Sequence, residues 1–305
     1  DSGLRSFRAE AVGTRSGQAW EQIDLPRALR GDVLVNLGNT APLLLGARQA
    51  VVIHDAGAFD TPESYSFAFR SWYRFLQKRL ARSGAMILTV SEFSRARIRA
   101  ALGVDAGVVT EGGEHVLRAP AEASILARHG LEPARFALVV GNPAAHKNLA
   151  ALTAAAETLG RHGLTLAVAG AADPAVFRAG GGVAADSAKL LGRVSDTELR
   201  ALYENALCLI FPSRYEGFGL PPIEAMVCGC PVLAAHAGAV PEVCGEAALW
   251  FDPAQPATLQ DAVSRLVGED GLRDGMIRAG LDRARLFTWE RAARTLLSLV
   301  EGRRA

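Results

Sequence analysis

The segment from Phe211 to Met226 combines a glycine turn, two prolines and two glutamates, which are residue types suited to binding a small polar ligand. An apolar run ends at Phe211, a Gly-Phe-Gly turn follows, and Pro221 and Pro222 begin a predicted helix. Glycine lets main-chain N–H groups approach a ligand closely, and a helix N-terminus offers free donors and a positive dipole end. The sequence therefore predicts a phosphate-binding turn between a strand and a helix.

Two glutamates flank this turn. Glu216 precedes it, and Glu224 lies in what we expect to be the first helical turn. Carboxylates do not hold phosphate, but they accept hydrogen bonds from pairs of sugar O–H groups. The alternative for Glu224 is an acidic helix start, which stabilises the helix dipole by about 0.3–1 kcal/mol. That alternative does not explain why the turn stands between two glutamates, so we expect both to face one crevice.

Two further side chains lie at the ends of predicted strands. Lys147 follows Gly141 in a loop directly after a strand, which is a suitable place for an anion clamp. The alternative is a solvated surface lysine. A lone histidine is more often structural, but the strand-end position of His54 favours a functional role. Asp55 either orients His54 or caps the following turn.

Short apolar runs alternate with longer helical patterns, as is typical of α/β proteins with parallel sheets. Ser195 and Glu198 form a predicted capping box, and an Ala/Leu-rich helix is expected over Asn148–Gly160. A polar stretch at Gly130–Pro133 separates two doubly wound domains, and Gly180–Gly182 reads as a flexible loop. The expected strands are Asp32–Leu37, Ala50–His54, Met86–Val90, Val108–Thr110, Phe136–Val140, Leu164–Ala169, Lys189–Gly192, Leu207–Pro212, Pro231–Ala235 and Ala248–Phe251.

The composition excludes several classes of protein. The chain has 305 residues, is 50% hydrophobic and 21% charged, and has a formal net charge of +1. It is therefore neither a disordered chain nor a general nucleic-acid binder, which needs a basic excess. The four cysteines form no Cys-x-x-Cys pair, and no metal-ligand pattern is visible, so we expect reduced thiols, a cytoplasmic protein and no metal. No apolar run could span a membrane and no signal peptide is visible, but Asp1 is not an initiator methionine, so we expect the true N-terminus to lie upstream.

The sequence resembles the retaining nucleotide-sugar glycosyltransferases of GT-B fold. Within them it resembles the glycosyltransferase family 4 type (glycosyl transferases group 1), and in particular the mannosyltransferase-like members. The stretch from Glu216 to Glu224 resembles the Glu-x7-Glu signature of that family. The resemblance runs from about Asp32 to the end of the chain and is closer in the second half. Other segments that fit the family in the same order are Val51–Asp55, Leu88–Arg95, Gly141–Asn148, Leu191–Leu199 and Cys230–Val243.

The resemblance implies two Rossmann-like domains that face each other across a cleft. It places an acceptor-side domain at residues 1–132, a nucleotide-sugar-binding domain at 133–287, and a C-terminal helix at 288–305 that crosses back to the first domain. The first domain shows no opening strand with a Gly-rich turn, so we expect the N-terminal domain to be incomplete.

Carried over residue by residue, the resemblance also implies roles. Glu216 binds hydroxyls of the donor sugar and His54 touches that sugar near the reacting carbon, so these two are the catalytic candidates. Lys147 neutralises the nucleotide diphosphate, and Glu224 binds the ribose. The other candidates for donor binding are Gly141, Arg214, Gly217, Phe218, Gly219 and Leu220, the last three through their main-chain N–H groups.

Two departures from the family pattern affect this site. The arginine that often lies near the clamp lysine is replaced by Asn142 and His146, and Arg214 would supply the second positive charge if its side chain turns into the cleft. The usual Asn-Gly after the fourth strand is replaced by Glu111–Glu114, at a turn that often borders the acceptor.

The implied reaction moves a sugar from a nucleoside-diphosphate sugar, with GDP-mannose as the first guess, to an acceptor hydroxyl. The expected acceptor is a lipid-linked oligosaccharide or a polysaccharide. The resemblance implies retention of the anomeric configuration through a front-face mechanism, in which the leaving phosphate takes the acceptor proton. No cofactor and no metal is expected, and the nucleoside diphosphate leaves as product.

The segment Ser64–Ser83 interleaves aromatic with basic side chains. Such a helix suits a membrane surface that carries anionic lipid, and it would hold the protein at the inner face of the plasma membrane. The alternative is an ordinary amphipathic helix, with its aromatic side chains in the core and its arginines in water.

Three rival functions stay open. A nicotinamide-dependent oxidoreductase would need Gly-x-Gly-x-x-Gly after a first strand, and the sequence contains no such stretch. A sugar-nucleotide epimerase of GT-B shape would use the carboxylates and His54 differently. A catalytically impaired nucleotide-sugar-binding protein is slightly favoured by the missing arginine and the incomplete first domain. The nucleotide base, donor sugar, acceptor and oligomeric state are not readable from the sequence.

Overall fold

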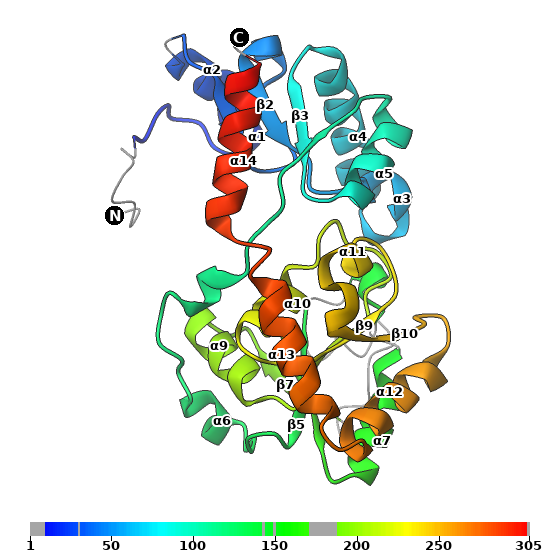
Figure 1. The fold of residues 1–305 in the computed structure, drawn as a ribbon. Coiled ribbons are helices and arrows are strands. Elements are labelled where there is room, and N and C mark those ends of the chain that lie inside the picture. Colours follow the sequence, from blue (N-terminus) through cyan, green and yellow to red (C-terminus); the bar gives the residue numbers. More distant parts are fainter. Residues whose placement is uncertain (1–9, 30, 142–143, 149–150, 171–187, 304–305) are drawn as a thin grey trace.

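The computed structural model describes residues 10–29, 31–141, 144–148, 151–170 and 188–303. These residues form two lobes, each built around its own parallel sheet (Figure 1). The chain leaves the first lobe after strand β4 (Gly107–Val108) and returns to it between helices α13 (Leu272–Ala284) and α14 (Trp289–Gly302). The predicted α/β class with parallel sheets is confirmed.

Strands and helices alternate along both lobes. The remaining strands are β1 (Leu34–Asn36), β2 (Gln49–Val52), β3 (Met86–Thr89), β5 (Phe136–Val140), β6 (Thr165–Ala169), β7 (Lys189–Gly192), β8 (Cys208–Phe211), β9 (Val232–Ala235) and β10 (Ala248–Phe251). The other α-helices are α1 (Gly17–Ala19), α2 (Leu25–Ala28), α3 (Gly57–Asp60), α4 (Phe67–Arg82), α5 (Glu92–Leu102), α6 (Ser124–Arg128), α7 (Leu152–Arg161), α9 (Asp196–Asn205), α10 (Leu220–Val227), α11 (Val240–Cys244) and α12 (Pro256–Gly268). Short 3₁₀ or π turns are η1 (Trp20–Asp24), η2 (Leu43–Arg48), η3 (Pro62–Ser64), η4 (Glu114–Leu117), η5 (Ala145–Lys147) and η7 (Gly245–Ala247).

The first sheet has four parallel strands in the order β1-β2-β3-β4. Its side chains alternate between the two faces, as strand geometry requires. Val51, Ile53 and Ile87 pack with residues of α4 and α5, whereas Val52 and Leu88 belong to the cluster against which α14 packs. Helices α4 and α5 therefore cover one face of this sheet, and α14 lies on the other (Figure 1).

The second sheet has six parallel strands in the order β10-β9-β8-β5-β6-β7. The strand order reverses at β5, because β6 and β7 continue on one side and β8 begins the other side. Ligands of open α/β sheets bind outside the carboxyl ends of the strands at such a switch point. The loops after β5 and β8 carry Gly141 and Glu216, so this topology directs predicted ligand-binding residues to one place.

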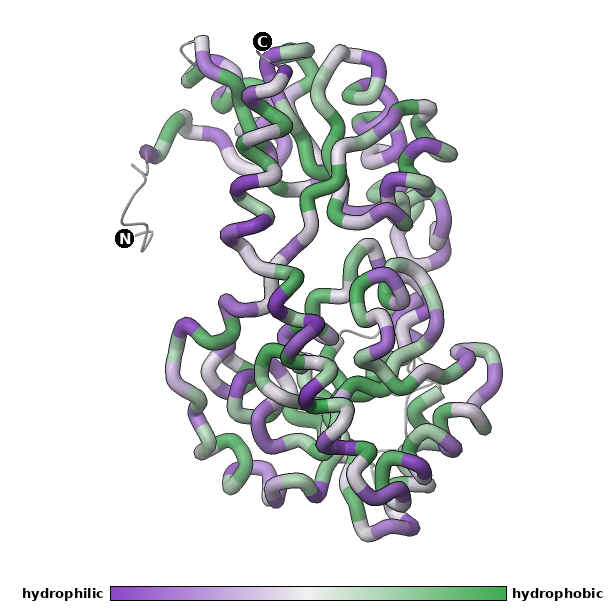
Figure 2. The backbone as a smooth tube through the Cα atoms, in the orientation of Figure 1, coloured by the Kyte–Doolittle hydropathy of each residue, from purple (hydrophilic) through white to green (hydrophobic). Residues whose placement is uncertain are grey.

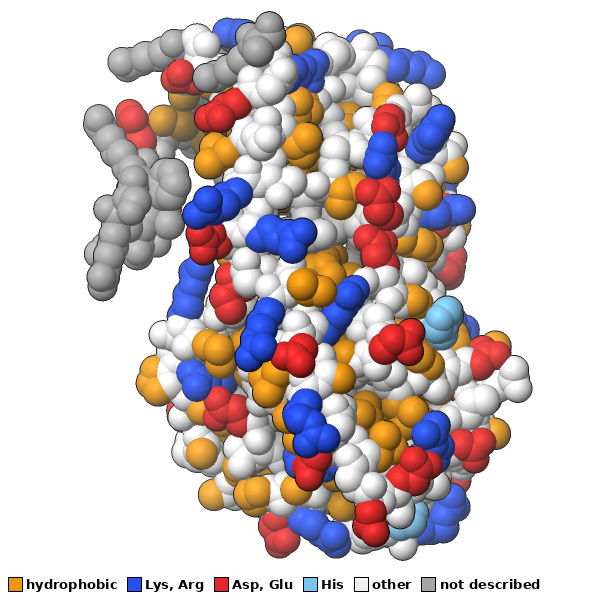
Figure 3. Space-filling view, viewed as in Figure 1, with side chains coloured by type: hydrophobic (Ala, Val, Ile, Leu, Met, Phe, Trp, Pro, Cys, Tyr) orange, Lys and Arg blue, Asp and Glu red, His pale blue; other side chains and the backbone are white. Residues whose placement is uncertain are grey.

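Hydrophobic segments fill the interior of both lobes, and hydrophilic residues recur on the outer turns of the helices (Figure 2). In the second lobe, α7 and α12 pack on one sheet face and α9 and α10 on the other. Acidic and basic side chains are interspersed over the face shown in Figure 3, in line with the net charge of +1. Every helix in the described ranges is too short or too polar to cross a lipid bilayer.

The expected strands are all present, and β5, β7 and β10 have the expected bounds. The capping box is also confirmed, because Ser195 and Glu198 each accept a hydrogen bond from the main-chain N–H of the other. The helix expected from Asn148 begins instead at Leu152, because Asn148 has a left-handed φ of 53° that ends a 3₁₀ turn. The predicted flexible loop at Gly180–Gly182 lies outside the described residues.

Helix α4 differs from the amphipathic alternative considered above. Its buried side chains are Leu76, Gln77 and Leu80. Its aromatic side chains face outward instead, with Phe67 exposed by 74% and Phe75 by 51%. The interpretation that placed the aromatic side chains of this helix in the core is therefore wrong.

Candidate active site

Lys147 and Glu216 meet at the carboxyl ends of β5 and β8. Lys147 ends the 3₁₀ turn η5, and Glu216 lies in the loop between β8 and α10. Lys147 Nζ is 2.6 Å from Glu216 Oε1 and 5.7 Å from the centre of the Phe211 ring. The two side chains are only 19% and 15% exposed, so solvent screens this ion pair weakly. The structure thus brings the predicted anion clamp and the predicted sugar-binding carboxylate together.

Gly217 is the point at which the turn after Glu216 touches the first lobe. A Cβ atom at Gly217 would lie 2.4 Å from the carbonyl oxygen of His54, so this position requires glycine. The Gly217 carbonyl accepts hydrogen bonds from Ser91 Oγ at 2.6 Å and from Ser94 Oγ at 3.0 Å. The predicted donor-binding turn therefore lies directly against the loop that carries His54.

The start of α10 offers fewer donors than an ordinary helix N-terminus. Gly219 is the N-cap residue with a φ of 110°, and Pro221 and Pro222 have no N–H. The donors of this helix start are therefore the main-chain N–H groups of Gly219 and Leu220. Phe218 packs against Phe287, with ring centres 5.6 Å apart, so its side chain anchors the turn.

Glu224 is the fifth residue of α10, so the expectation that it lies in the first helical turn is wrong. Its carboxylate is buried, and its Oε2 accepts a hydrogen bond from the Tyr203 hydroxyl at 2.9 Å. Its Oε1 is 2.9 Å from His115 Nε2, while Trp289 Nε1–H donates to His115 Nδ1 at 3.0 Å. Because an indole N–H can only donate, Nε2 carries the imidazole proton and donates to Glu224. Glu224 nevertheless raises the pKa of His115.

His54 lies two residues beyond β2, and its main chain is held on both sides. Its N–H donates to Asn39 Oδ1 at 2.8 Å, and its carbonyl oxygen accepts from Ser94 Oγ at 2.9 Å. The imidazole Nδ1 is 3.1 Å from Glu111 Oε1, and Nε2 is 2.8 Å from the Leu37 carbonyl oxygen. The Glu111 carboxylate is the main cause that raises the pKa of His54, and burial opposes it.

Three other candidates lie around this centre. Asp55 caps the following turn, because its Oδ1 accepts from the Gly57 N–H at 2.7 Å, and burial raises the pKa of Asp55. Gly141 directly follows β5. Arg214 is exposed, and its main-chain N–H donates to the carbonyl oxygen of His146 at 2.8 Å. The second positive charge expected from Arg214 stays a prediction, and Asn142 lies outside the described residues.

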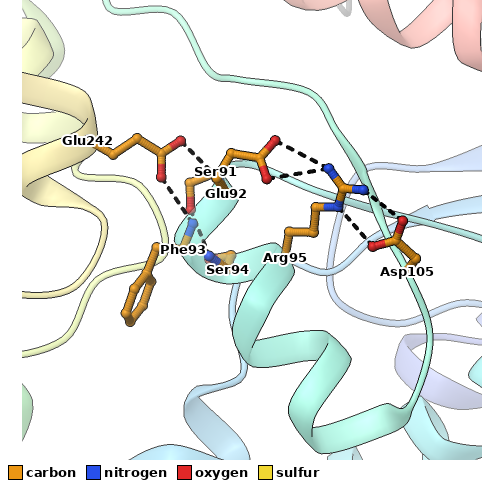
Figure 4. A network of polar contacts seen from close by, with 7 residues as sticks. All are labelled: Ser91, Glu92, Phe93, Ser94, Arg95, Asp105 and Glu242. Carbon is orange, nitrogen blue, oxygen red and sulfur yellow. Dashed lines mark hydrogen bonds and ion pairs between the residues drawn. The ribbon is translucent and has the colours of Figure 1, made fainter.

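Polar contacts join the two lobes beside the site (Figure 4). Glu242 accepts hydrogen bonds from the N–H groups of Glu92 at 2.9 Å and Phe93 at 3.0 Å, at the N-terminus of α5. A carboxylate at this end of a helix satisfies free donors and complements the dipole. Tyr215 adds a second link, because its hydroxyl donates to Asp60 Oδ2 at 2.9 Å. These contacts keep the predicted donor-binding turn and His54 in one arrangement.

The described residues include no group of three or more His, Cys, Asp or Glu side chains placed to hold a metal ion. The four cysteines are unpaired. Burial raises the pKa of Cys208 and of Cys244 to about 12, so neither is a thiolate at neutral pH.

The partners that orient the candidate residues are not predictable from the sequence. Tyr203 and His115 bind Glu224, and Glu111 binds His54, yet none is near its partner in the chain. The replaced Asn-Gly turn at Glu111–Glu114 is the one signal in the sequence, and it contains only Glu111 of these three residues. It marked an unusual loop but not the side chains that the loop would meet.

Comparison with known proteins gives three kinds of match. A family profile described as "Glycosyl transferases group 1" matches residues 124–283. The chain is 32% identical over 259 residues to the O-antigen chain mannosyltransferase B of Escherichia coli, covering 80% of this chain and 67% of the relative. It is 28% identical over 246 residues to the O-antigen chain mannosyltransferase RfbU of Salmonella typhimurium, covering 77% and 67%. The chain thus spans about two thirds of the length of these relatives.

Solved structures share the two-lobed architecture. A sucrose-phosphate synthase from Thermosynechococcus elongatus superposes with a TM-score of 0.67 at 22% identity, covering 83% of this chain and 67% of the other. A UDP-forming α,α-trehalose-phosphate synthase from Burkholderia xenovorans gives a TM-score of 0.73 at 13% identity, covering 92% and 76%. At these identities the likeness concerns the fold, and it confirms the predicted GT-B architecture.

Proposed function

The chain belongs to the glycosyl transferases group 1 family, and from this premise we propose that it transfers mannose from GDP-mannose to a hydroxyl of a lipid-linked oligosaccharide or polysaccharide. The observation that carries the proposal is the meeting of Lys147 and Glu216 at the switch point of the second sheet, beside the contact of Gly217 with His54. Two relatives that match over most of this chain are O-antigen chain mannosyltransferases, which supports both mannose and a saccharide acceptor.

In this proposal the donor lies across the loops after β5 and β8. Lys147 and the N–H groups of Gly219 and Leu220 bind the diphosphate. Glu224 accepts hydrogen bonds from the ribose hydroxyls through the lone pairs that its two protein partners leave free. Glu216 exchanges Lys147 for hydroxyl groups of the sugar once the diphosphate engages the lysine.

The transfer proceeds with retention on the front face of the sugar. The bond from the anomeric carbon to the diphosphate oxygen breaks, the acceptor oxygen bonds to that carbon from the same side, and the diphosphate takes the acceptor proton. Positive charge on Lys147 and the donors at the start of α10 stabilise the charge that develops on the leaving group. The reaction therefore needs neither a cofactor nor a metal ion.

A thermal-shift panel with GDP, UDP, dTDP and ADP is the first experiment. A nucleotide at about 100 times its dissociation constant adds roughly 2.7 kcal/mol of stability, which raises the melting temperature by several degrees. We expect GDP to give the largest shift in melting temperature. In a second assay, we expect the protein to transfer mannose from GDP-mannose at a rate that EDTA does not change. NMR of the product should show an α linkage. A larger shift with UDP would indicate that the donor is a UDP-sugar and not GDP-mannose. Binding without transfer would favour the catalytically impaired protein, and epimerised donor would favour the epimerase.

Glu216→Gln tests the role of the loop carboxylate. Removing one preorganised group that stabilises the transition state costs about 10²–10³ in kcat. GDP affinity should stay within a few-fold, because in this proposal Glu216 binds the sugar and not the nucleotide. Glu246→Gln, at an exposed glutamate outside the site, is the matched control. An unchanged rate for Glu216→Gln would remove Glu216 from the mechanism.

We also propose that α4 holds the protein at an anionic membrane on the cytoplasmic side. Its outward face presents Phe67 and Phe75 followed by Lys78, Arg79 and Arg82, and the helix contains no acidic residue. Aromatic side chains insert at the lipid interface, and each basic residue near an anionic surface adds about 1 kcal/mol. This face would bring a lipid-linked acceptor to the site.

Sedimentation with vesicles of phosphatidylglycerol tests this surface. We expect binding at low salt, little binding to phosphatidylcholine, and a loss of at least tenfold in the Phe67→Ser/Phe75→Ser variant. Leu297→Ser, which removes an exposed apolar side chain from α14, is the matched control. If wild type does not sediment with the anionic vesicles, the membrane contact is refuted while the transferase proposal stands.

A further inference from the structure

The imidazole of His54 lies between two hydrogen-bond acceptors. Its Nδ1 faces the Glu111 carboxylate at 3.1 Å, and its Nε2 faces the carbonyl oxygen of Leu37 at 2.8 Å. Carboxylate and carbonyl oxygens accept hydrogen bonds and cannot donate them, so both ring nitrogens must carry a proton for both contacts to form. A ring with two N–H groups is an imidazolium cation.

The surroundings of the ring favour this cation. The side chains of His54 and Glu111 are 34% and 15% exposed, so water screens their attraction only in part. The pair forms a polar wall of an otherwise apolar cavity of about 260 Å³, to which α14 contributes Trp289, Ala292, Ala293 and Leu296. Among the described residues, the charged groups that act on the ring are Glu111 and Asp55, and both are negative.

We propose that Glu111 is a positioning residue that holds His54 as an imidazolium on the sugar side of the site. This proposal rests on the function proposed above and deepens it. Both N–H groups of the ring are used on Glu111 and on the Leu37 carbonyl, so the cation acts on the departing diphosphate through its positive charge. His54 keeps both of its protons throughout, because the proton of the acceptor goes to the diphosphate. The Glu111–Glu114 turn, a departure from the family pattern, thereby acquires a role.

The pH dependence follows from the same contacts. The Glu111 carboxylate, the Leu37 carbonyl and Asp55 raise the pKa of His54 above its ordinary value of 6.5. A group with a raised pKa in the folded state contributes fully below its ordinary pKa, and its contribution is lost as the pH rises through the raised value. Activity and stability that depend on the cation should therefore fall on the alkaline side. Glu111→Gln keeps the shape of the side chain and moves this loss to lower pH.

NMR titration of the His54 imidazole in the full chain tests the proposal directly, with a His54→Gln variant to assign the signal. We expect a pKa above 6.5 in wild type, and a fall by about 1–3 units in Glu111→Gln, as expected when a close opposite charge is removed. Glu92→Gln, at an exposed carboxylate on α5, should leave the value unchanged. A wild-type pKa at or below 6.5, or the same pKa in Glu111→Gln, would overturn the proposal.

The pH profile of kcat/KM separates positioning from a structural defect. In Glu111→Gln the alkaline limb should move to lower pH by the shift seen in the titration, and the rate should approach that of wild type at acidic pH. A loss that is equal at every pH would contradict the proposal. Glu111→Asn is the second variant if Glu111→Gln does not fold. The NMR titration does not require enzymatic turnover. An inactive wild type would therefore refute the transferase proposal, while the titration would still show whether Glu111 holds His54 as a cation.

Discussion

Two histidine–glutamate pairs lie at the candidate site, and they differ in what faces the second ring nitrogen. The pair His54–Glu111 spans 3.1 Å and the pair His115–Glu224 spans 2.9 Å. The other nitrogen of His54 faces a main-chain carbonyl oxygen, which accepts, whereas that of His115 faces the indole N–H of Trp289, which donates. The first histidine therefore needs two protons and the second needs one. In both pairs the carboxylate raises the pKa of the histidine, and the third group decides whether the contacts require one proton on the ring or two.

The two arrangements suit different tasks. A cation at His54 stabilises negative charge near the sugar, where the bond to the diphosphate breaks. His115 orients the Glu224 carboxylate through its Nε2–H, together with the buried Tyr203 hydroxyl. On the proposed function, the first pair acts in catalysis and the second acts in nucleotide binding.

The largest expected effect comes from removing the cation at the sugar end. His54→Gln keeps a hydrogen-bond donor but loses the charge, and we expect kcat to fall about 10²–10³-fold, with GDP affinity within a few-fold. Initial rates and isothermal titration calorimetry measure the two quantities. The control is His162→Gln, at an exposed histidine outside the site. A weaker GDP affinity with unchanged kcat would reverse the assignment of the two pairs.

At the nucleotide end, Glu224→Gln should act mainly on donor binding. A hydrogen bond to a charged group contributes about 1.5–3 kcal/mol, so the donor KM should rise about tenfold or more, with a smaller change in kcat. Measurement of KM and kcat with GDP-mannose distinguishes the two. Equal losses of kcat in Glu224→Gln and His54→Gln would contradict the proposal that the two pairs have different functions.

Tyr203→Phe should have a moderate effect, because it removes one of the two protein partners of Glu224. Tyr203 is fully buried and donates to a carboxylate, so we expect a loss of about 1.5–3 kcal/mol in the free energy of unfolding and a few-fold rise in the donor KM. Urea unfolding and kinetics check both values. Tyr73→Phe, at a partly exposed tyrosine of α4, serves as the comparison. A change in stability without any change in KM would mean that Tyr203 does not orient Glu224 for the nucleotide.

The smallest effect on turnover, and the sharpest test of the comparison, is expected for Trp289→Phe. Without the indole donor, Nδ1 of His115 is free to take a proton beside Glu224, so the pKa of His115 should rise. NMR titration measures this rise, and transfer should stay within about twofold of wild type. The shift is opposite in direction to that expected for His54 in Glu111→Gln. An unchanged or lower pKa would show that the indole does not set the protonation of His115.

Much of the fold was predictable because its signals are local. The predicted bounds of β5, β7 and β10 agree with the observed ones, since each strand is a short apolar run between turn residues. The Ser195 capping box and the proline start of α10 are also local patterns. The outward face of α4 was not decided by pattern, because aromatic spacing alone does not say which side of a helix meets the sheet.

The sequence by itself determined the alternation of elements, the glycine turn beside Glu216 and the strand-end positions of Lys147 and His54. Tertiary structure alone decided which of these groups face one another. Lys147 and Glu216 are 69 residues apart in the chain, and His115 and Trp289 are 174 apart. Sheet order and the return of α14 bring them together, and hydrogen-bond partners of this kind have no local signature. The charge of a histidine depends on both of its neighbours, so it is a property of the folded chain.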